Sequence, residues 1–323
     1  MIITLTPNPT IDRVYYLPSL EPNTVHRAIQ EVATPSGKGV DASIILQLLG
    51  EPTVALGFNA GEMGRVLGGY LDAQGVPHDF VEAHGETRTV PVLVDTKRGT
   101  EYTITAPTLF ATDEQFVELL NRIGKYATTG WGLIAAGSLP PGIPSDGYAR
   151  IVEQSKAANL FTLLDTSGES LRQGIKALPH LLKINHAELA DIDGEFAAYA
   201  VQINASDKRP VNLSEFAQAL SAQLGTLASE AIIISMGKRG VLAITNTEAT
   251  YAGALSVPVG VTNGAGDAMD TGIMLALMRG QGWIEALRLG TAMAAAAVMH
   301  EGTAGLDPAN VDELLPQVQV ETL

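Results

Sequence analysis

A glycine-rich turn that ends in an acidic residue could do chemistry. Gly264-Ala265-Gly266-Asp267 follows a strand-like run at residues 254–261 and opens a helical pattern. Small residues let a ligand approach the backbone, and the unpaired amides of a helix start attract anions. The carboxylate of Asp267 could take the proton of a hydroxyl that attacks a phosphorus atom held by those amides. The alternative is an ordinary turn in which Asp267 stabilises the helix start.

A second glycine-rich turn, Ser36-Gly37-Lys38-Gly39, also precedes a helical pattern. With Asp41 and Ala42 it matches the G-x-G-x-x-A spacing of dinucleotide-binding turns, but Pro35 lies where a buried strand is required. We therefore exclude a nicotinamide dinucleotide site. No G-x-x-x-x-G-K-[ST] pattern is present, so a P-loop is excluded as well. What remains is a cradle for a phosphate or a sugar, against the alternative of a solvated lysine in a turn.

Other polar residues follow predicted strands. Asn185 and Glu188 come after the apolar run at 181–184 and could orient a metal-bound water or a phosphate, or simply begin a helix. Asp12 follows the N-terminal strand and could hold sugar hydroxyls or cap a turn. The six histidines show no ligand spacing, and no G-x-S-x-G motif supports a serine hydrolase. The absence of cysteine excludes disulfides, thiolate catalysis and cysteine-ligated metals.

Composition limits the partners of the chain. Its 323 residues carry a formal net charge of −15, and 46% of them are hydrophobic. This acidity argues against nucleic acid or an anionic membrane as a partner, so an anionic ligand must be held by local basic groups or helix starts. The apolar stretches are too short for a membrane span, and the N-terminus does not resemble a signal peptide. We expect a cytoplasmic protein.

The elements that position these residues alternate between strand and helix. Helical patterns occupy about 40–49, 112–123, 145–152, 214–227, 264–278 and 284–300, and strand-like runs occupy 132–136, 160–164, 181–184, 231–235 and 240–245. Such alternation predicts an α/β fold with a doubly wound, mostly parallel sheet and helices on both faces. We expect one domain over residues 1–323.

Four short runs near the N-terminus break this rhythm. Residues 13–17, 25–32, 87–95 and 100–105 alternate like half-buried strands. They predict a small antiparallel β lid, formed by about residues 12–35 and 86–106, over the carboxyl edge of the main sheet. Such a lid could also serve as a dimer surface.

Eight motifs, in order, give the chain a resemblance to a known family. They are TLTPNPTID at 4–12, SGKG at 36–39, ETR at 86–88, AGSLPPG at 136–142, LDTSGE at 164–169, KINHAEL at 183–189, SMGKRG at 235–240 and GAGDAM at 264–269. Together they resemble the ribokinase-like phosphofructokinase-B (pfkB) carbohydrate kinases, and within them the branch of 1-phosphofructokinases and tagatose-6-phosphate kinases. The resemblance implies a ribokinase-like fold, ATP and Mg²⁺ as cofactors, a sugar phosphate as substrate and a homodimer formed through the lid.

The resemblance also implies roles on the nucleotide side. Asp267 would be the catalytic base, and the anion hole for the γ-phosphate would consist of Gly264, Ala265 and Gly266. Asn185 and Glu188 would organise Mg²⁺, through water, and the nucleotide phosphates. The residues expected to line the nucleotide site are Lys183, Ser235, Gly237 and Gly240. A monovalent cation near the anion hole is a further cofactor to consider.

On the acceptor side, Asp12 would hold sugar hydroxyls. The other residues implied around the acceptor are Arg27, Gly37, Lys38, Gly39, Asp41, Arg88 and Ser138. Three positions depart from the usual pattern of the branch, because Ser36 replaces Gly, Asp41 replaces Asn and Asp270 replaces an apolar residue. A carboxylate of Asp41 at ~4 Å from an acceptor phosphate would cost about 4 kcal/mol at an effective dielectric constant of 20. Buried beside Asp267, Asp270 would raise the pKa of the base, but we expect it to be solvated and without effect.

The expected activity is ATP-dependent phosphorylation of fructose 1-phosphate to fructose 1,6-bisphosphate by in-line transfer. Alternatives within the kinases are tagatose 6-phosphate, fructose 6-phosphate, or an unphosphorylated sugar or nucleoside, for which Asp41 is the reason. A non-catalytic sugar or nucleotide sensor on the same scaffold is a different class of function. The intact Asp267 and its glycine-rich turn argue against the sensor.

Overall fold

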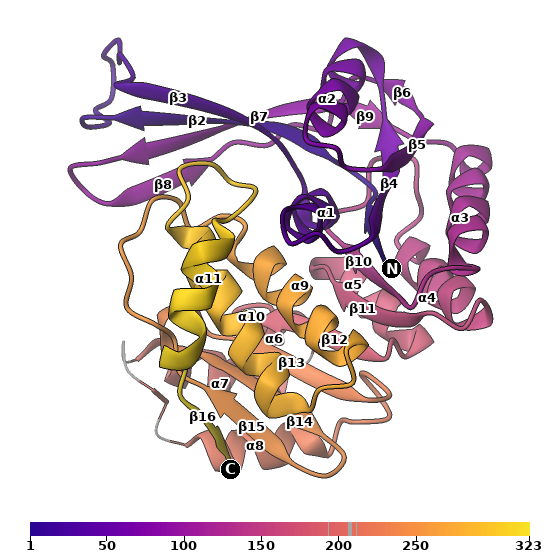
Figure 1. Cartoon of the computed structure of the whole chain (residues 1–323), viewed down its shortest axis with the longest axis vertical. Helices are drawn as coiled ribbons and strands as arrows, with labels where there is room; N and C mark the ends of the chain where they lie inside the picture. Colours follow the sequence, from indigo (N-terminus) through magenta and orange to yellow (C-terminus); the bar gives the residue numbers. More distant parts are fainter. Residues whose placement is uncertain (193, 206–208, 211) are drawn as a thin grey trace.

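A ten-stranded sheet forms the centre of the molecule, shown in Figure 1 as a computed structural model that describes residues 1–192, 194–205, 209–210 and 212–323. Its strands, listed from one edge to the other, are β16 (Val320–Thr322), β15 (Ala249–Ala252), β14 (Val241–Thr245), β13 (Ala231–Ser235), β12 (Leu181–Asn185), β11 (Phe161–Asp165), β10 (Gly132–Ala136), β1 (Ile2–Thr6), β4 (Thr53–Asn59) and β5 (His78–Glu82). The strands from β13 to β5 pair in parallel, and β14 to β16 continue the sheet in antiparallel pairing. The expected doubly wound, mostly parallel sheet is confirmed.

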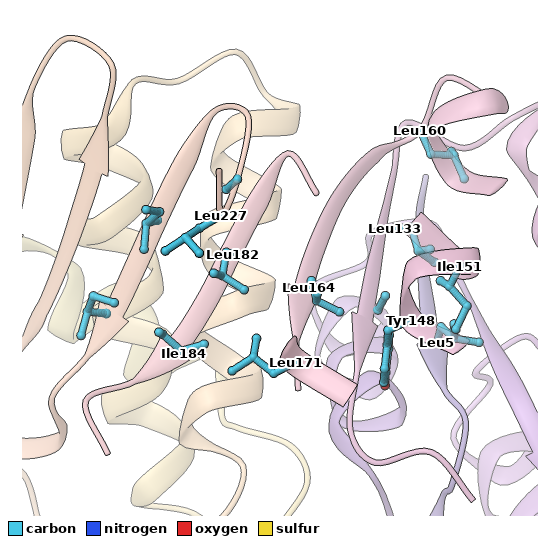
Figure 2. Packing of buried hydrophobic residues seen from close by; sticks show 14 of the residues in the cluster. Leu5, Leu133, Tyr148, Ile151, Leu160, Leu164, Leu171, Leu182, Ile184 and Leu227 are labelled. Carbon is cyan, nitrogen blue, oxygen red and sulfur yellow. The ribbon is translucent and has the colours of Figure 1, made fainter. Parts of the chain in front are cut away.

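Helices cover both faces of this sheet, so its central strands are buried along their whole length. One face packs on α3 (Asp113–Ala127), α4 (Gly147–Ala157), α5 (Gly168–Gly174), α7 (Gly194–Asn204) and α8 (Leu213–Ser221). Figure 2 shows part of this core, where Tyr148 and Ile151 of α4 lie against strand residues such as Leu133 and Leu164. The opposite face packs on α1 (Lys38–Leu48), α9 (Ala265–Met278), α10 (Trp283–Val298) and α11 (Pro308–Leu314).

Short elements complete the chain. Helix α2 (Gly61–Ala73) packs beside α1, α6 (Leu189–Ile192) precedes α7, and β6 (His84–Gly85) pairs with β9 (Leu109–Phe110). The expected capping box is present at the start of α3, where Thr112 and Gln115 exchange hydrogen bonds. Within the described residues no helix is both long and apolar enough to span a membrane.

A four-stranded sheet projects from the main body as the lid (Figure 1). Its strands, in order across the sheet, are β3 (Gln30–Ser36), β2 (Thr10–Leu17), β7 (Arg88–Asp95) and β8 (Thr100–Thr103). The two hairpins are antiparallel as expected, whereas β2 and β7 pair in parallel because they start from the same side of the molecule. The inner face of the lid packs its valines around Val261, in the loop before α9.

Hydrogen bonds also tie the lid to the loops beneath it. Glu101 of β8 accepts bonds from the backbone and the hydroxyl of Thr262, at 2.9 and 3.0 Å. Thr34 of β3 shares a hydrogen bond of 3.0 Å with Thr303, in the loop after α10. The lid is thus fastened on two sides of the carboxyl edge of the main sheet.

Several expected boundaries are wrong. Residues 254–261 form no strand but an irregular segment, because no neighbouring strand pairs with their backbone after β15 ends. Strand β3 begins only at Gln30, after a loop over residues 18–29, and α8 ends at Ser221 rather than near residue 227. Helix α4 starts at Gly147 after Asp146, one residue beyond the expected Ser145 cap. The β4–α2–β5 unit was not among the predicted elements.

Gly57 tests the contact between β1 and β4. A Cβ atom there would lie 2.0 Å from the carbonyl oxygen of Thr6, which is backbone and has no room to move. We expect Gly57→Ala to lower the free energy of unfolding by about 3 kcal/mol or more, since it forces the two paired strands apart. Denaturant unfolding followed by circular dichroism measures this change.

Gly69→Ala is the matched control, because a Cβ atom on this exposed face of α2 meets nothing within 4 Å. That substitution should raise stability by up to about 1 kcal/mol. Equal stability of the two variants would contradict the close approach of β1 and β4.

Candidate active site

The carboxyl ends of the parallel strands bring polar residues to one edge of the sheet, the usual ligand site of such folds. Asp165 ends β11, Asn185 ends β12 and Ser235 ends β13. Helices α1 and α9, which carry the two glycine-rich turns, pack against one another at this edge. The two motifs with the strongest chemical signal therefore meet in one place.

Asp165 is paired with two lysines from different elements. Its Oδ1 atom lies 2.6 Å from Nζ of Lys38, in the first turn of α1, and its Oδ2 atom lies 2.7 Å from Nζ of Lys183 on β12. Burial alone would raise the pKa of Asp165, but the two ammonium groups outweigh it and hold the pKa well below its usual range. Asp165 thus keeps Lys38 and Lys183 charged and close together.

Tight backbone contacts set the position of the Ser36–Gly39 turn. Gly37 has a φ of 117°, and a Cβ atom at Gly39 would lie 2.7 Å from the backbone of Leu5. The hydroxyl of Thr6 accepts a hydrogen bond of 2.8 Å from the amide of Val40. The turn is therefore pressed against the end of β1, and Lys38 is directed toward Asp165.

The second turn places Asp267 at the start of α9. Gly264 has a φ of 87°, and a Cβ atom there would lie 2.1 Å from the carbonyl oxygen of Thr303, so only glycine fits. A Cβ atom on Gly266 would lie 3.0 Å from Nζ of Lys183, which places that ammonium beside the amides of the helix start. Burial raises the pKa of Asp267, although Lys38 and Lys183 oppose the rise. Asp267 therefore lies next to the positive charges of Lys38 and Lys183.

Asp41 lies on the other side of Asp267. It is 3% exposed, and its Oδ2 atom accepts a hydrogen bond of 3.2 Å from the hydroxyl of Ser36. Burial and the carboxylates of Asp267 and Asp12 raise the pKa of Asp41 well above its ordinary value. The two departures, Ser36 and Asp41, therefore contact one another, and Asp41 in turn contacts the expected base, Asp267.

Asp270 is buried, contrary to expectation. It is 0% exposed and lies one turn beyond Asp267, with Oδ1 3.4 Å from Nζ of Lys183. Its side chain lies beside Asp165 of β11 and Lys183 of β12, within the buried part of the edge. Burial raises the pKa of Asp270 well above the usual range, more than Lys183 lowers it.

Carboxylate oxygens of Asp165, Asp267 and Asp270 lie within 4.8 Å of one another, a spacing that could hold a metal ion. The ammonium group of Lys183 already lies beside two of them, and that of Lys38 beside one. Lysine nitrogens thus supply the positive charge that this cluster needs. We do not assign it as a metal site.

Three of the four residues expected to line the nucleotide site line one cavity of about 440 Å³ next to the start of α9, and Lys183 is not among its lining residues. Ser235, Gly237 and Gly240 lie on one side of it, and Ala265 and Gly266 lie on the other. The remaining wall is largely apolar, formed by the irregular segment before α9 and by α10. An apolar wall of this kind suits a flat aromatic ring.

Asn185 and Glu188 form a capping box. The Oδ1 atom of Asn185 accepts a bond of 3.0 Å from the amide of Glu188, and Oε2 of Glu188 accepts a bond of 2.8 Å from the amide of Asn185. The hydrogen bonds between Asn185 and Glu188 therefore agree with the interpretation that these residues begin a helix. Glu188 still has a second carboxylate oxygen, half-buried beside Lys38, Lys183 and Asp165.

Only some of the residues expected around the acceptor lie close together. Asp12 and Arg88 are electrostatic neighbours, and Arg88 donates a bond of 2.9 Å to the carbonyl of Asn8. Arg88 and Asn8 line a cavity of about 500 Å³ under the lid, and Asn8 also lies 3.5 Å from Ser138. Arg27 is not brought to this site, because it is exposed in the loop between β2 and β3.

Sequence reasoning missed Asp165 and Asn8. Asp165 belongs to the quoted motif LDTSGE and directly follows a predicted strand, so the rule that strand ends carry ligand contacts would have identified it. Asn8 lies in TLTPNPTID, between two prolines, and had no comparable signal.

The buried position of Asp270 has a measurable effect on stability. Its pKa is raised in the folded state, so above about pH 4 the folded chain holds a proton that the unfolded chain has lost, and stability falls as pH rises. Asp270→Asn cannot titrate, so we expect the variant to gain at least about 1 kcal/mol over the parent between pH 5 and pH 8. Denaturant titrations at the two pH values measure the difference.

The exposed Asp312→Asn on α11 is the control for this experiment and should leave the pH dependence unchanged. If Asp270→Asn behaved in the same way, the raised pKa of Asp270 would be wrong.

Comparisons with known proteins agree with this geometry. Residues 5–310 match the family model described as pfkB family carbohydrate kinase. The chain is 30% identical to a 1-phosphofructokinase of Bacillus subtilis and 28% identical to a tagatose-6-phosphate kinase of Staphylococcus epidermidis, over 99–100% of each chain. Phosphofructokinase-2 of Escherichia coli, solved in complex with potassium, superposes with a TM-score of 0.82 at 23% identity, over 98% of each chain. The chain belongs to the pfkB family of carbohydrate kinases.

Proposed function

We propose that this kinase transfers the γ-phosphoryl group of ATP to a hydroxyl of a sugar phosphate, with Asp267 as general base. The observation that carries the proposal is the position of Asp267, buried between the start of α9 and the lysines held by Asp165. Lys38 and Lys183 place positive charge beside the buried carboxyls that include Asp267, at the start of α9, and the cavity of about 440 Å³ lies next to the same helix start. The single kinase domain spans the chain and carries the lid as an insertion.

The mechanism is a direct in-line displacement. Asp267 takes the proton of the acceptor hydroxyl as its oxygen bonds to the γ-phosphorus, and the bond from that phosphorus to the bridging oxygen of ADP breaks. The amides of Ala265 and Gly266, together with the ammonium of Lys183, lie where negative charge develops on the transferring group. Lys38 adds positive charge from the acceptor side. The lid excludes water from the reacting groups.

A magnesium ion would be held by Glu188, with Asn185 orienting bound water. The fit rests on the second carboxylate oxygen of Glu188, since Mg²⁺ prefers one or two carboxylates together with substrate phosphates and water. When bound, Mg²⁺ would neutralise negative charge on the phosphates of ATP. A monovalent cation near the anion hole is supported only by the potassium complex of the related fold.

Fructose 1-phosphate, phosphorylated at its 6-hydroxyl, is the acceptor that we propose first. The 1-phosphofructokinase of B. subtilis supports it, and Arg88 supplies a half-buried cation in the cavity under the lid. Tagatose 6-phosphate is the second candidate, because the relative from S. epidermidis carries that name.

Coupled ADP release with MgATP tests the acceptor and the base together. The panel consists of fructose 1-phosphate, fructose 6-phosphate, tagatose 6-phosphate, fructose, ribose and a nucleoside. We expect turnover to be highest with fructose 1-phosphate, and Asp267→Asn to lower kcat by about 10²–10⁴-fold because the variant cannot accept the proton. Asp312→Asn should match the parent.

Each other outcome excludes one part of the proposal. Turnover only on neutral acceptors would exclude the sugar phosphate and leave the kinase. ATP binding without turnover on any acceptor would favour the sensor. Full activity of Asp267→Asn would exclude Asp267 as the base.

We also propose that two copies associate through the lid. Large apolar side chains are exposed there, with Val25 at 86% and Ile29 at 69%. Tyr102 and Ile104 add apolar surface from the second hairpin. Exposed apolar groups gathered in one appendage are typical of a protein interface.

Sedimentation velocity tests this association. We expect the parent to sediment as a dimer and Ile29→Asp to shift toward monomer, because association would bury an unpaired charge. Val201→Asp, at an equally exposed valine on α7, is the control and should leave the dimer intact. A monomeric parent would refute the lid interface.

A further inference from the structure

One carboxyl oxygen of Asp41, Oδ1, has no hydrogen-bond donor among the described residues. The hydroxyl of Ser36 satisfies Oδ2 at 3.2 Å, whereas Oδ1 is buried and has no hydrogen-bond donor within the described residues. The neighbour of this carboxyl is the carboxyl of Asp267, within hydrogen-bonding contact. Two ionised carboxylates have four acceptor oxygens and no proton between them, so a buried contact of this kind requires that one of them be protonated.

The surrounding charges decide which carboxyl holds the proton. Asp267, on α9, faces Lys38 and Lys183, whose positive charges favour its ionised form. Asp12, on β2, lies beside the hydroxyls of Thr10, Ser36 and Thr303 and the positive charge of Arg88, which oppose the rise of its pKa that burial causes.

Among the described residues, Asp41 accepts a hydrogen bond from the hydroxyl of Ser36, on β3, and has two acidic neighbours, Asp12 and Asp267. The ammonium of Lys38, three residues earlier on its own helix, is directed to Asp165. Burial and these two carboxylates raise the pKa of Asp41 well above its ordinary value, in agreement with the donor count.

We propose that Asp41 is a positioning residue that remains a neutral carboxylic acid and donates its hydrogen bond to the carboxylate of Asp267. The inference rests on the proposed role of Asp267 as the base. The bond fixes one oxygen of Asp267 and leaves the other free to face the acceptor hydroxyl. Asp41 then presents no negative charge to an anionic acceptor, which removes the repulsion expected from an ionised residue at this position.

The proposal predicts that the activity of the enzyme falls at alkaline pH. Ionisation of Asp41 would remove the hydrogen bond from Asp267 and place two carboxylates in buried contact. The kcat/KM for the acceptor should then fall about tenfold per pH unit above that ionisation. Asp41→Asn keeps a donor of the same shape and cannot ionise, so its profile should stay level through the same range.

Two variants at the same position separate positioning from packing. We expect Asp41→Asn to retain kcat/KM within about threefold of the parent at pH 7, since its amide still donates to Asp267. Asp41→Ala should lose about 10–100-fold, mostly in kcat, since the donor to a charged group is removed. Ser43→Ala, which removes a buried hydroxyl on α1 bonded to Thr4 and Thr53, is the control; it should affect stability and leave the pH profile unchanged.

Infrared difference spectroscopy detects the proton without turnover. The spectrum of the parent at pH 7 should contain a protonated-carboxyl band that is lost in Asp41→Asn and kept in Ser43→Ala. An absent difference, or an alkaline limit that persists in Asp41→Asn, would overturn the proposal. Because the band is measured on the free protein, a failure to phosphorylate any sugar phosphate would refute the proposed function and leave this test intact.

Discussion

The pairing of Asp165 with Lys38 and Lys183 is the interaction on which the site depends. It joins the first turn of α1 to the ends of β11 and β12, and it holds two ammonium groups beside the helix start that carries Asp267. Removing Asp165 would take away the carboxylate that the buried Lys183 and the half-buried Lys38 share. Loss of one partner from such a buried group costs more free energy than the intact group contributes to stability. The geometry of both glycine-rich turns would change with it.

The same interaction explains how a strongly acidic chain can bind two anions. With Asp41 and Asp270 neutral, the positive charges of Lys38, Lys183 and Arg88 oppose the carboxylates of Asp12, Asp165, Asp267 and Glu188. The amides at the start of α9 then add positive potential at this edge of the sheet. The formal charge of −15 is spread over the rest of the molecule, and salt in the solvent weakens its effect on the buried site.

Sequence reasoning predicted the features that depend on residues close together in the chain. It failed for the features that depend on tertiary packing. The turns at 36–39 and 264–267 were predicted because glycine permits their backbone within a few residues, and Asn185 because it ends a strand. The burial of Asp270 and the contact between Asp41 and Asp267 depend on how closely α1 packs against α9, which no local pattern contains. The apolar run at 254–261 resembled a strand, but β15 ends before it and its side chains line the nucleotide cavity instead.

The contact of Glu101 with Thr262 joins parts of the molecule that are 161 residues apart in sequence. One partner lies on the cover of the acceptor side, and the other lies in the loop that leads into the anion hole. If one of these two segments moves, the hydrogen bonds between Glu101 and Thr262 must break or the other segment must move with it. Acceptor and nucleotide should therefore influence one another's affinity, by the same factor in both directions. A lid fastened in this way would couple the two proposed ligand sites through the chain itself.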